Sequence, residues 1–187
     1  NDVKPNCKIS VMMDCWRYDV DRLPPRSETD IDLVRVCSYE EQLDEALEKC
    51  RGLKDLGYEV SLNVICTSYI DVDSFVKIRE KLLTEDFLDF VCFADSYGAL
   101  TPDYVKKIMT LFRNMNPNVL IGFHSHDNMS LSMANTITAI ENGADMVDGT
   151  YTGMGRGGGN LRLELITLYL ALNKNYDAFN LSELFEY

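Results

Sequence analysis

Histidine, tryptophan and basic residues are scarce in this sequence. Its 187 residues include two histidines and one tryptophan, and 18 lysines and arginines stand against 30 acidic residues. The resulting formal charge of -12 repels phosphate backbones and anionic membrane surfaces unless a local basic cluster intervenes, and the sequence contains no such cluster. We therefore expect no nucleic-acid partner and no membrane partner.

Closely spaced cysteine pairs and long hydrophobic runs are also missing. The six cysteines form no C-x-x-C motif, and four of them lie in or beside apolar runs, which is typical of reduced, packed thiols in a cytosolic protein. No apolar run reaches the roughly 18 residues that a membrane-spanning helix needs. The polar start NDVKPNCK is not that of a signal peptide. These absences predict a cytoplasmic protein.

What the sequence does contain is an alternation of short apolar runs, rich in β-forming residues, with longer stretches of helical periodicity. A hydrophobic fraction of 46% with 26% charged residues is ordinary for a globular domain. The predicted strands cover residues 8–14, 32–37, 59–66, 88–95, 118–124 and 144–150. The predicted helices cover residues 38–57, 72–83, 101–115 and 130–143, with one more after Asn160. This order predicts a parallel sheet with crossover helices.

Several residues mark the expected ends of these helices. Gly57 and Gly143 follow helical stretches, and the dipeptide Thr101-Pro102 is a favourable helix start. Ser38, with a glutamate three residues later, has the spacing of a capping box. The stretch 18–30 is the one irregular insertion between predicted elements.

The number of βα units bears on the fold. Each unit takes about 25 to 30 residues, so six fill this chain, whereas a closed eight-stranded barrel takes about 250 residues. Two folds fit: an open doubly wound sheet, or a (β/α)8 TIM barrel that lacks its first two units. An open sheet of six units would leave unpaired edges on both sides, so a missing segment is favoured over a natural half-barrel. We expect a single domain over residues 1–187.

Polar residues gather at or just past the carboxyl ends of the predicted strands. They are Asp14, Asp95, His124, His126 and Asp148. Parallel α/β proteins of both kinds build their active sites at this edge of the sheet, so we expect the functional site there.

The two histidines stand in the motif His-Ser-His. Residues two apart on an extended segment point to the same side, so His124 and His126 can both reach one divalent metal ion. The alternative is two unrelated histidines, but their place at a strand end favours ligands. Asp127 and Asn128 begin the next loop, where roles as turn and helix-cap residues account for them at least as well as a direct role in the site.

Other polar residues have two interpretations each. Asp95 and Ser96 offer a carboxylate and a hydroxyl at the same edge, or form a turn before the next helix. Arg35 lies in an apolar strand and needs a partner if it faces inward, such as Asp14 or Asp95. The glycine-rich stretch 149–160 allows close backbone approach to a ligand, but it lacks the lysine of a phosphate-binding P-loop.

Three motifs occur in order along the chain: FADSYGALTP, GFHSHDN followed by NTITAIENGAD, and GTYTGMGRGGGN. Together they resemble the metal-dependent aldolase and Claisen-condensing barrels, a family that includes 4-hydroxy-2-oxovalerate aldolase, HMG-CoA lyase, and the isopropylmalate and homocitrate synthases. The similarity covers residues 8–172 and is nearest to the 4-hydroxy-2-oxovalerate aldolases.

The resemblance implies a (β/α)8 TIM barrel in which His124 and His126 bind a divalent metal ion and Asn160 completes or neighbours its coordination sphere. Mn²⁺ or Mg²⁺ is the expected cofactor, with Zn²⁺ as the alternative. Ser96 matches a hydroxyl that contacts the keto-acid substrate in the aldolases, and Arg35 is the second candidate substrate-binding residue. The implied enzyme is a carbon–carbon lyase that splits a 4-hydroxy-2-oxo acid into pyruvate and an aldehyde through the pyruvate enolate.

One part of the family pattern is absent. Its members carry Arg-Asp-Gly or Arg-Asp-Glu at the end of the first strand, and the aldolases add a catalytic histidine just after it. This sequence has none of these, and its first predicted strand, residues 8–14, resembles the third strand of the family. We expect strands 3 to 8 of the barrel here, with the catalytic residues of strand 1 missing. Asp14 and Arg17 belong to another unit and do not replace them.

Two alternatives to the aldolase remain. The first is an acyl-CoA-using lyase or synthase of the same family, although no CoA site is evident in the sequence. The second is a non-catalytic relative that binds metal or keto acid, which the missing strand-1 residues favour. A homodimer is compatible with either, and because the chain stops at NLSELFEY, soon after the last barrel helix, we expect no stable dehydrogenase partner.

Overall fold

A parallel sheet in strict chain order forms the centre of the molecule. The structure, a computed structural model, describes residues 7–176 and 180–185. Its strands are β1 (Ile9–Asp14), β2 (Ile31–Ser38), β3 (Glu59–Val64), β4 (Phe90–Asp95), β5 (Leu120–Ser125) and β6 (Met146–Val147). Every strand pairs in parallel with the next along the chain, in the order β1-β2-β3-β4-β5-β6. A doubly wound sheet reverses its order at a switch point, so this order decides for the barrel architecture, and the six predicted strands are confirmed.

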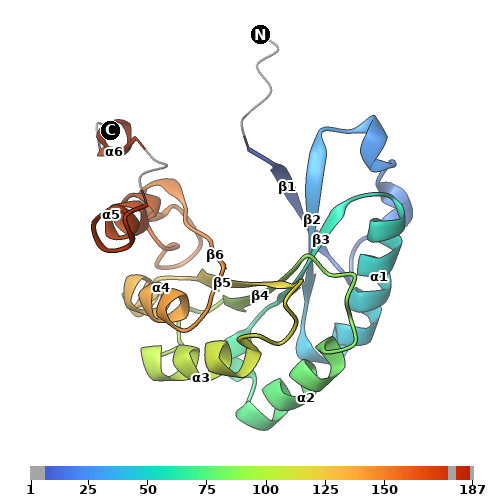
Figure 1. The fold of residues 1–187 in the computed structure, drawn as a ribbon, viewed down its shortest axis with the longest axis horizontal. Helices are drawn as coiled ribbons and strands as arrows, with labels where there is room; N and C mark the ends of the chain where they lie inside the picture. The colour runs from blue at the N-terminus through green and yellow to red at the C-terminus, as the bar shows by residue number, and fades with distance from the viewer. Residues whose placement is uncertain (1–6, 177–179, 186–187) are drawn as a thin grey trace.

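The helices cover the outer side of this sheet. They are α1 (Leu43–Asp55), α2 (Val72–Leu82), α3 (Pro102–Phe112), α4 (Ser132–Glu141) and α5 (Leu163–Lys174), with a short α6 (Leu181–Phe185). The strands form an arc, and α1 to α5 lie along its convex side (Figure 1). Between β1 and β2 only the short 3-10 turns Val20–Arg22 and Arg26–Glu28 occur, at the predicted irregular insertion. Within the described residues, no helix combines the length and the apolar character that crossing a bilayer requires.

The predicted helix ends are confirmed at three places and wrong at one. Gly57 and Gly143 take φ values of 90° and 107° after α1 and α4, a region that glycine enters without steric cost. Pro102 opens α3 behind Thr101. Ser38 does not cap a helix, because pairing with β3 extends β2 through it and its hydroxyl donates to the carbonyl of Tyr39. Helix α1 therefore starts only at Leu43.

The last predicted strand is shorter than expected. Only Met146 and Val147 of the predicted segment 144–150 pair with β5. Beyond them, the backbone N–H of Thr150 donates to the carbonyl of Leu161, at 2.9 Å. The chain therefore leaves the sheet early because the segment after the glycine-rich stretch supplies the next backbone partners.

The two faces of the sheet differ in polarity. Side chains on the outer face are buried against the helices, among them Val36, Leu62 and Phe93, and they form one hydrophobic cluster with helix residues such as Phe75 and Phe112. The alternate residues face the concave side, where strand register places the polar set. That set consists of Arg35, Ser61, Asn63 and His124, and Cys92 and Gly122 lie on the same face. Because of this alternation, the candidate functional residues lie on the concave face of the sheet and the hydrophobic core lies between its outer face and the helices.

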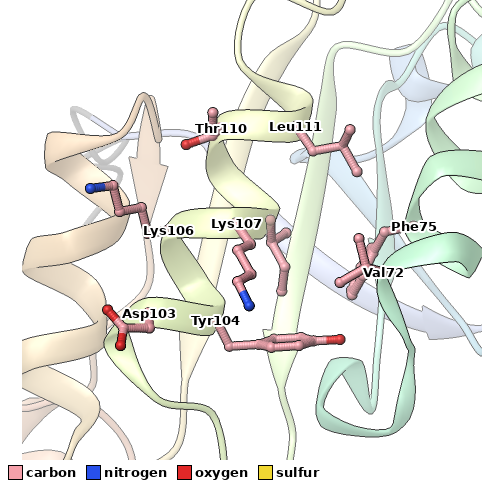
Figure 2. Close-up of a pocket in the computed structure, with 9 residues that line it drawn as sticks. Val72, Phe75, Asp103, Tyr104, Lys106, Lys107, Thr110 and Leu111 are labelled. Carbon is pink, nitrogen blue, oxygen red and sulfur yellow. The ribbon is translucent and has the colours of Figure 1, made fainter.

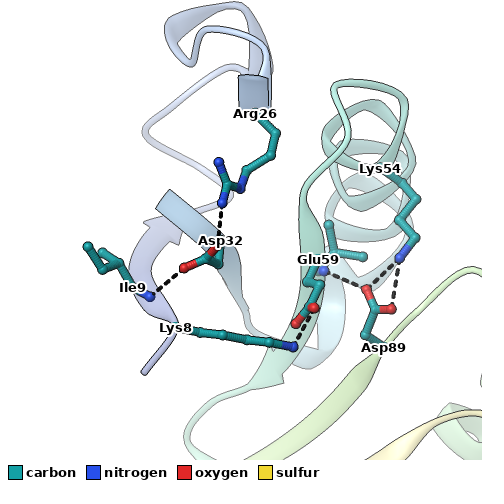
Figure 3. Close-up of polar contacts among 8 residues, drawn as sticks. Lys8, Ile9, Arg26, Asp32, Lys54, Glu59 and Asp89 are labelled. Atoms are coloured by element: carbon teal, nitrogen blue, oxygen red, sulfur yellow. Dashed lines mark hydrogen bonds and ion pairs between the residues drawn. The ribbon is translucent and has the colours of Figure 1, made fainter. Parts of the chain in front are cut away.

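The amino-terminal end of the sheet is held by carboxylates with structural roles. Asp32 accepts from a backbone N–H of β1 at 2.8 Å and pairs with Arg26. Asp89 accepts from the N–H of Val60 and from the ammonium group of Lys54, at 2.8 and 2.6 Å (Figure 3). These acids tie neighbouring strands together at the end of the sheet opposite to the histidine motif.

Candidate metal and substrate site

The histidine pair lies at the carboxyl end of β5. His124 is in the strand and His126 follows it, so both rings lie on the concave side, as predicted. Their ring centroids are 5.1 Å apart and their planes are inclined by 76°. This separation lets one nitrogen from each ring approach a common ion.

Each imidazole has one ring nitrogen engaged by an acceptor. Nδ1 of His124 lies 3.1 Å from Oδ2 of Asp148, and His126 bonds to the backbone carbonyl of Gly159. Burial, and then the neighbouring His124, hold the pKa of His126 below its ordinary value, so this ring stays neutral at neutral pH. In metal sites a carboxylate or carbonyl orients the histidine in this way and leaves the other nitrogen for the ion.

Asn160 supplies a third donor beside the pair. Its backbone forms an antiparallel bridge with that of His126, and its Nδ2 donates to the carbonyl of Met154 at 3.0 Å. Its Oδ1 is buried and has no hydrogen-bond partner within the described residues. A buried acceptor without a partner is costly, and a bound cation would satisfy it.

The donors therefore fit a divalent ion but do not complete its coordination. Two imidazoles and one amide oxygen suit Mn²⁺, Mg²⁺ or Zn²⁺ to differing degrees. Within residues 7–176 and 180–185, no three histidine, cysteine or acidic side chains gather closely enough to hold a metal. Any ion here would take its remaining ligands from substrate, water or other parts of the protein.

Arg35 extends across the interior to Asp148. Its Nη1 and Nη2 donate to the two carboxylate oxygens of Asp148 at 3.0 and 2.5 Å, and Nη2 lies 3.6 Å from the sulfur of Cys92. The prediction that Asp14 or Asp95 would be the partner of Arg35 was therefore wrong. Because β2 and β6 lie at different places in the sheet, this contact forms only through the curvature of the arc.

Asp148 is thereby shared between Arg35 and His124. Burial raises the pKa of Asp148, but hydrogen bonds from His124 and Arg35 outweigh this effect and hold it at about 2. The carboxylate thus stays charged and orients His124. In the amide orientation that satisfies both neighbours, Asn63 accepts from Arg35 at 3.0 Å and donates to Ser61 at 2.7 Å. Each terminal nitrogen of Arg35 donates to Asp148, so Arg35 positions this carboxylate.

The loop after β4 contacts the histidine motif. Asp95 turns away from the interior and accepts from the N–H groups of Ala99 and Leu100, both at 3.0 Å, which confirms its alternative role in a turn. The hydroxyl of Ser96 accepts from the N–H of Cys66 at 2.9 Å, so its own proton is free to be donated. Gly98 has a φ of 56°, and an added Cβ would lie 2.8 Å from the carbonyl oxygen of His126. The loop is therefore fixed directly against the candidate metal site.

The glycine-rich segment packs on the same motif. The carboxylate of Asp127 accepts from the N–H of Ser132 at the start of α4 at 2.9 Å, as expected of a cap residue. The amide oxygen of Asn128 accepts from the N–H of Gly158 at 2.7 Å, which is a contact between two loops and not the expected turn or cap bond. A Cβ on Gly158 would lie 2.7 Å from Cα of Asn128. The close approach predicted for these glycines is therefore an approach to the histidine loop, which it holds in place.

A groove on the other side of the sheet is not part of this site. Between α2 and α3 a groove of about 590 Å³ is lined by Phe75, Tyr104, Lys107 and Leu111, among others (Figure 2). It opens on the helix-covered side of the sheet, whereas the histidines face the concave side. Its apolar lining offers none of the donors described above.

Sequence comparisons point to one family. The HMGL-like family profile matches residues 8–187. The 4-hydroxy-2-oxovalerate aldolase of Thermomicrobium roseum is 31% identical over 163 residues, which cover 86% of this chain and 45% of that enzyme. The enzyme of the same name from Bacillus thuringiensis is 35% identical over 138 residues, or 74% of this chain and 40% of its own. The chain thus spans less than half the length of these relatives.

Solved structures share the fold. The N-terminal domain of a suspected aldolase from Bacteroides vulgatus is 30% identical, with a TM-score of 0.82 over 96% of this chain and 61% of that one. HMG-CoA lyase of Bacillus subtilis has a TM-score of 0.79 at 17% identity, over 98% of this chain and 68% of that one. The carboxyl transferase domain of Rhizobium etli pyruvate carboxylase has a TM-score of 0.80 at 16% identity, over 96% of this chain and 33% of that one. On the profile match and these likenesses, the chain belongs to the HMGL-like family.

Proposed function

We propose that the whole protein containing this chain is a divalent-metal-dependent aldolase, which splits a 4-hydroxy-2-oxo acid into pyruvate and an aldehyde or joins the two. The relatives named 4-hydroxy-2-oxovalerate aldolase support this assignment. The observation that carries it is the buried Oδ1 of Asn160 beside two histidines; within the described residues neither this oxygen nor the remaining ring nitrogens have a hydrogen-bond partner. His124, His126 and Asn160 would hold Mn²⁺ or Mg²⁺, with Zn²⁺ as the alternative.

The chemistry divides between the ion and the protein. A divalent ion bound there supplies Lewis-acid polarisation of the carboxylate and keto oxygens of the substrate, which stabilises the developing enolate charge. Asp148 fixes the ring of His124, and Arg35 fixes Asp148. The hydroxyl proton of Ser96 is available to a substrate oxygen at the same edge. Arg35 stays the second candidate for binding the substrate, beside its contact with Asp148.

Proton transfer needs groups that this sequence does not show. Cleavage requires a base for the 4-hydroxyl proton and an acid for C3 of pyruvate. The Arg-Asp motif and histidine that follow the first strand of the family have no counterpart in the sequence. An acyl-CoA-using lyase or synthase of the same family, and a metal- or keto-acid-binding relative without turnover, stay the alternatives. The cytoplasmic location, a homodimer, and the lack of a stable dehydrogenase partner stay predictions.

Manganese binding tests the proposal directly. We would titrate Mn²⁺ into the whole protein, with and without oxalate as an enolate mimic, and compare His124→Ala, His126→Ala and Asn160→Ala. Binding should strengthen with oxalate, disappear in both histidine variants, and weaken about tenfold or more in Asn160→Ala. Asn118→Ala, an exposed amide before the other end of β5, is the matched control and should bind as the parent does. Equal binding in all proteins would refute the metal site.

A further inference from the structure

Exposed aromatic side chains gather at the carboxyl end of the sheet. Trp16, Tyr39, Tyr69 and Tyr97 follow β1, β2, β3 and β4, and we call this set the aromatic rim. Their exposed fractions are 37%, 39%, 77% and 44%. Scattered exposed hydrophobic residues need no explanation, but one large aromatic ring after each of these consecutive strands indicates a shared surface.

The rim residues contact one another in pairs. The rings of Trp16 and Tyr39 are 5.0 Å apart, and those of Tyr69 and Tyr97 are 5.1 Å apart in an edge-to-face arrangement. Besides the Cys66 thiol, which acts most strongly, Tyr69 and Tyr39 raise the pKa of Tyr97. The first pair joins the loops after β1 and β2, and the second joins the loops after β3 and β4.

One residue of the rim lies on a loop of the candidate site. Tyr97 stands between Ser96 and Gly98, and Gly98 packs on the backbone of His126. The hydroxyl of Tyr97 shares a hydrogen bond with the thiol of Cys66, whose backbone N–H donates to the hydroxyl of Ser96. Tyr97 therefore lies on the same loop as Ser96, and this loop packs on the histidine motif.

Aromatic rings suit one kind of ligand group. Tyrosine and tryptophan offer rigid, flat contact area at a small cost in conformational entropy, and they pack well against other rings at centroid distances of about 4.5 to 7 Å. A methyl group as small as that of acetaldehyde would contact few of these atoms. A ring-sized apolar group would cover several of them at once.

We propose that the aromatic rim binds an aromatic or ring-sized apolar group on the aldehyde half of the substrate and so selects bulky aldehydes over acetaldehyde. This inference rests on the proposed aldolase function and specifies its substrate class. In the condensation direction, C3 of pyruvate loses a proton and forms a bond to the aldehyde carbonyl carbon, whose oxygen gains a proton. The reaction needs no oxidant or reductant, and the rim takes no part in proton transfer.

Two measurements on the whole, metal-loaded protein separate this inference from the proposed function. Exchange of the C3 protons of pyruvate with solvent deuterium, followed by NMR, reports enolate formation without any aldehyde. The kcat/KM of condensation is then measured with benzaldehyde and with acetaldehyde as probes. We expect exchange to occur, and benzaldehyde to be preferred by about tenfold or more.

Variants of the rim locate the preference. Tyr69→Ala and Tyr97→Ala should each lower kcat/KM for benzaldehyde by about threefold to tenfold and leave acetaldehyde and proton exchange within about twofold. Tyr69→Phe keeps the ring and should keep the preference, and Tyr176→Ala, a half-exposed tyrosine after α5, is the matched control.

Each outcome of these measurements supports or overturns the inference about the aromatic rim. If proton exchange is absent, the proposed function fails and the inference fails with it. If exchange occurs but the two aldehydes react equally, or the rim variants lower both alike, only the inference is overturned. A change in oligomeric state in the rim variants, with unchanged aldehyde kinetics, would assign the rim to a contact between subunits and overturn it as well.

Discussion

Replacing Asp148 by asparagine should destabilise the protein and disorder the site together. The carboxylate holds two donors, Arg35 and His124, and the side chains of the ion pair are only 14% and 21% exposed. A pKa lowered from 3.8 to about 2 corresponds to about 2.5 kcal/mol of stability at neutral pH. Because the substitution also leaves the charge of Arg35 buried without its partner, we expect a total loss of about 3 kcal/mol.

The pH dependence of this contribution has a defined sign. The pKa of Asp148 is depressed in the folded state, so its stabilisation is fully present above about pH 4 and is lost as the pH falls toward 2. Denaturant titrations of the parent and of Asp148→Asn across this range should therefore converge at acidic pH. The difference in the free energy of unfolding between the two proteins reports the contribution of Asp148 alone, because the other carboxylates are the same in both.

Two further variants test the reasoning. Asp14 and Arg17 form an exposed pair at 3.8 Å, with side chains 34% and 66% exposed, so Asp14→Asn should cost no more than about 0.5 kcal/mol. Replacing both Arg35 and Asp148 by apolar residues of similar volume should recover much of the stability lost in Asp148→Asn. The reasoning is refuted if Asp148→Asn unfolds at the same denaturant concentration as the parent at neutral pH.

Two other predictions concern the glycine-rich segment and the cysteines. Gly158→Ala should lower stability by about 2 kcal/mol and weaken Mn²⁺ binding, since the new Cβ would lie 2.7 Å from Cα of Asn128. Gly149→Ala, whose nearest contact is 3.3 Å, should cost less in the same thermal melts, and equal losses would contradict this account. Burial raises the pKa of Cys37 to about 11 and that of Cys92 to about 12, so iodoacetamide should modify exposed Cys7 well before either, as followed by peptide mass spectrometry. Early labelling of Cys92 would show that the interior opens.

The strands and helices were largely readable from the sequence because their signals are local. Apolar runs such as residues 88–95 and helical periodicity such as residues 72–83 depend only on neighbours along the chain. The capping box at Ser38 failed because pairing with β3 extended the strand, which is a tertiary effect. The strand after residue 144 was predicted too long for a similar reason, since backbone bonds to Leu161 end it.

The site was predictable only in part. His124, His126 and Asn160 carry a recognisable motif, and the structure brings them together. The partner of Arg35 was not predictable, because Asp148 lies 113 residues away and meets it only through the curvature of the sheet. The aromatic rim consists of one residue from each of four loops, and this arrangement can be recognised only when the strand ends are known.

The bond between Arg35 and Asp148 also has a consequence for the order of folding events. It joins β2 to β6, so it cannot form until the intervening strands have assembled, and contacts between residues so distant in sequence close late and slowly. Asp148, which orients His124, is itself fixed by Arg35 only at that moment. During refolding, competence to hold a metal ion should therefore appear after the bulk of the helical signal. The ion would act as a reporter of the last stage of assembly.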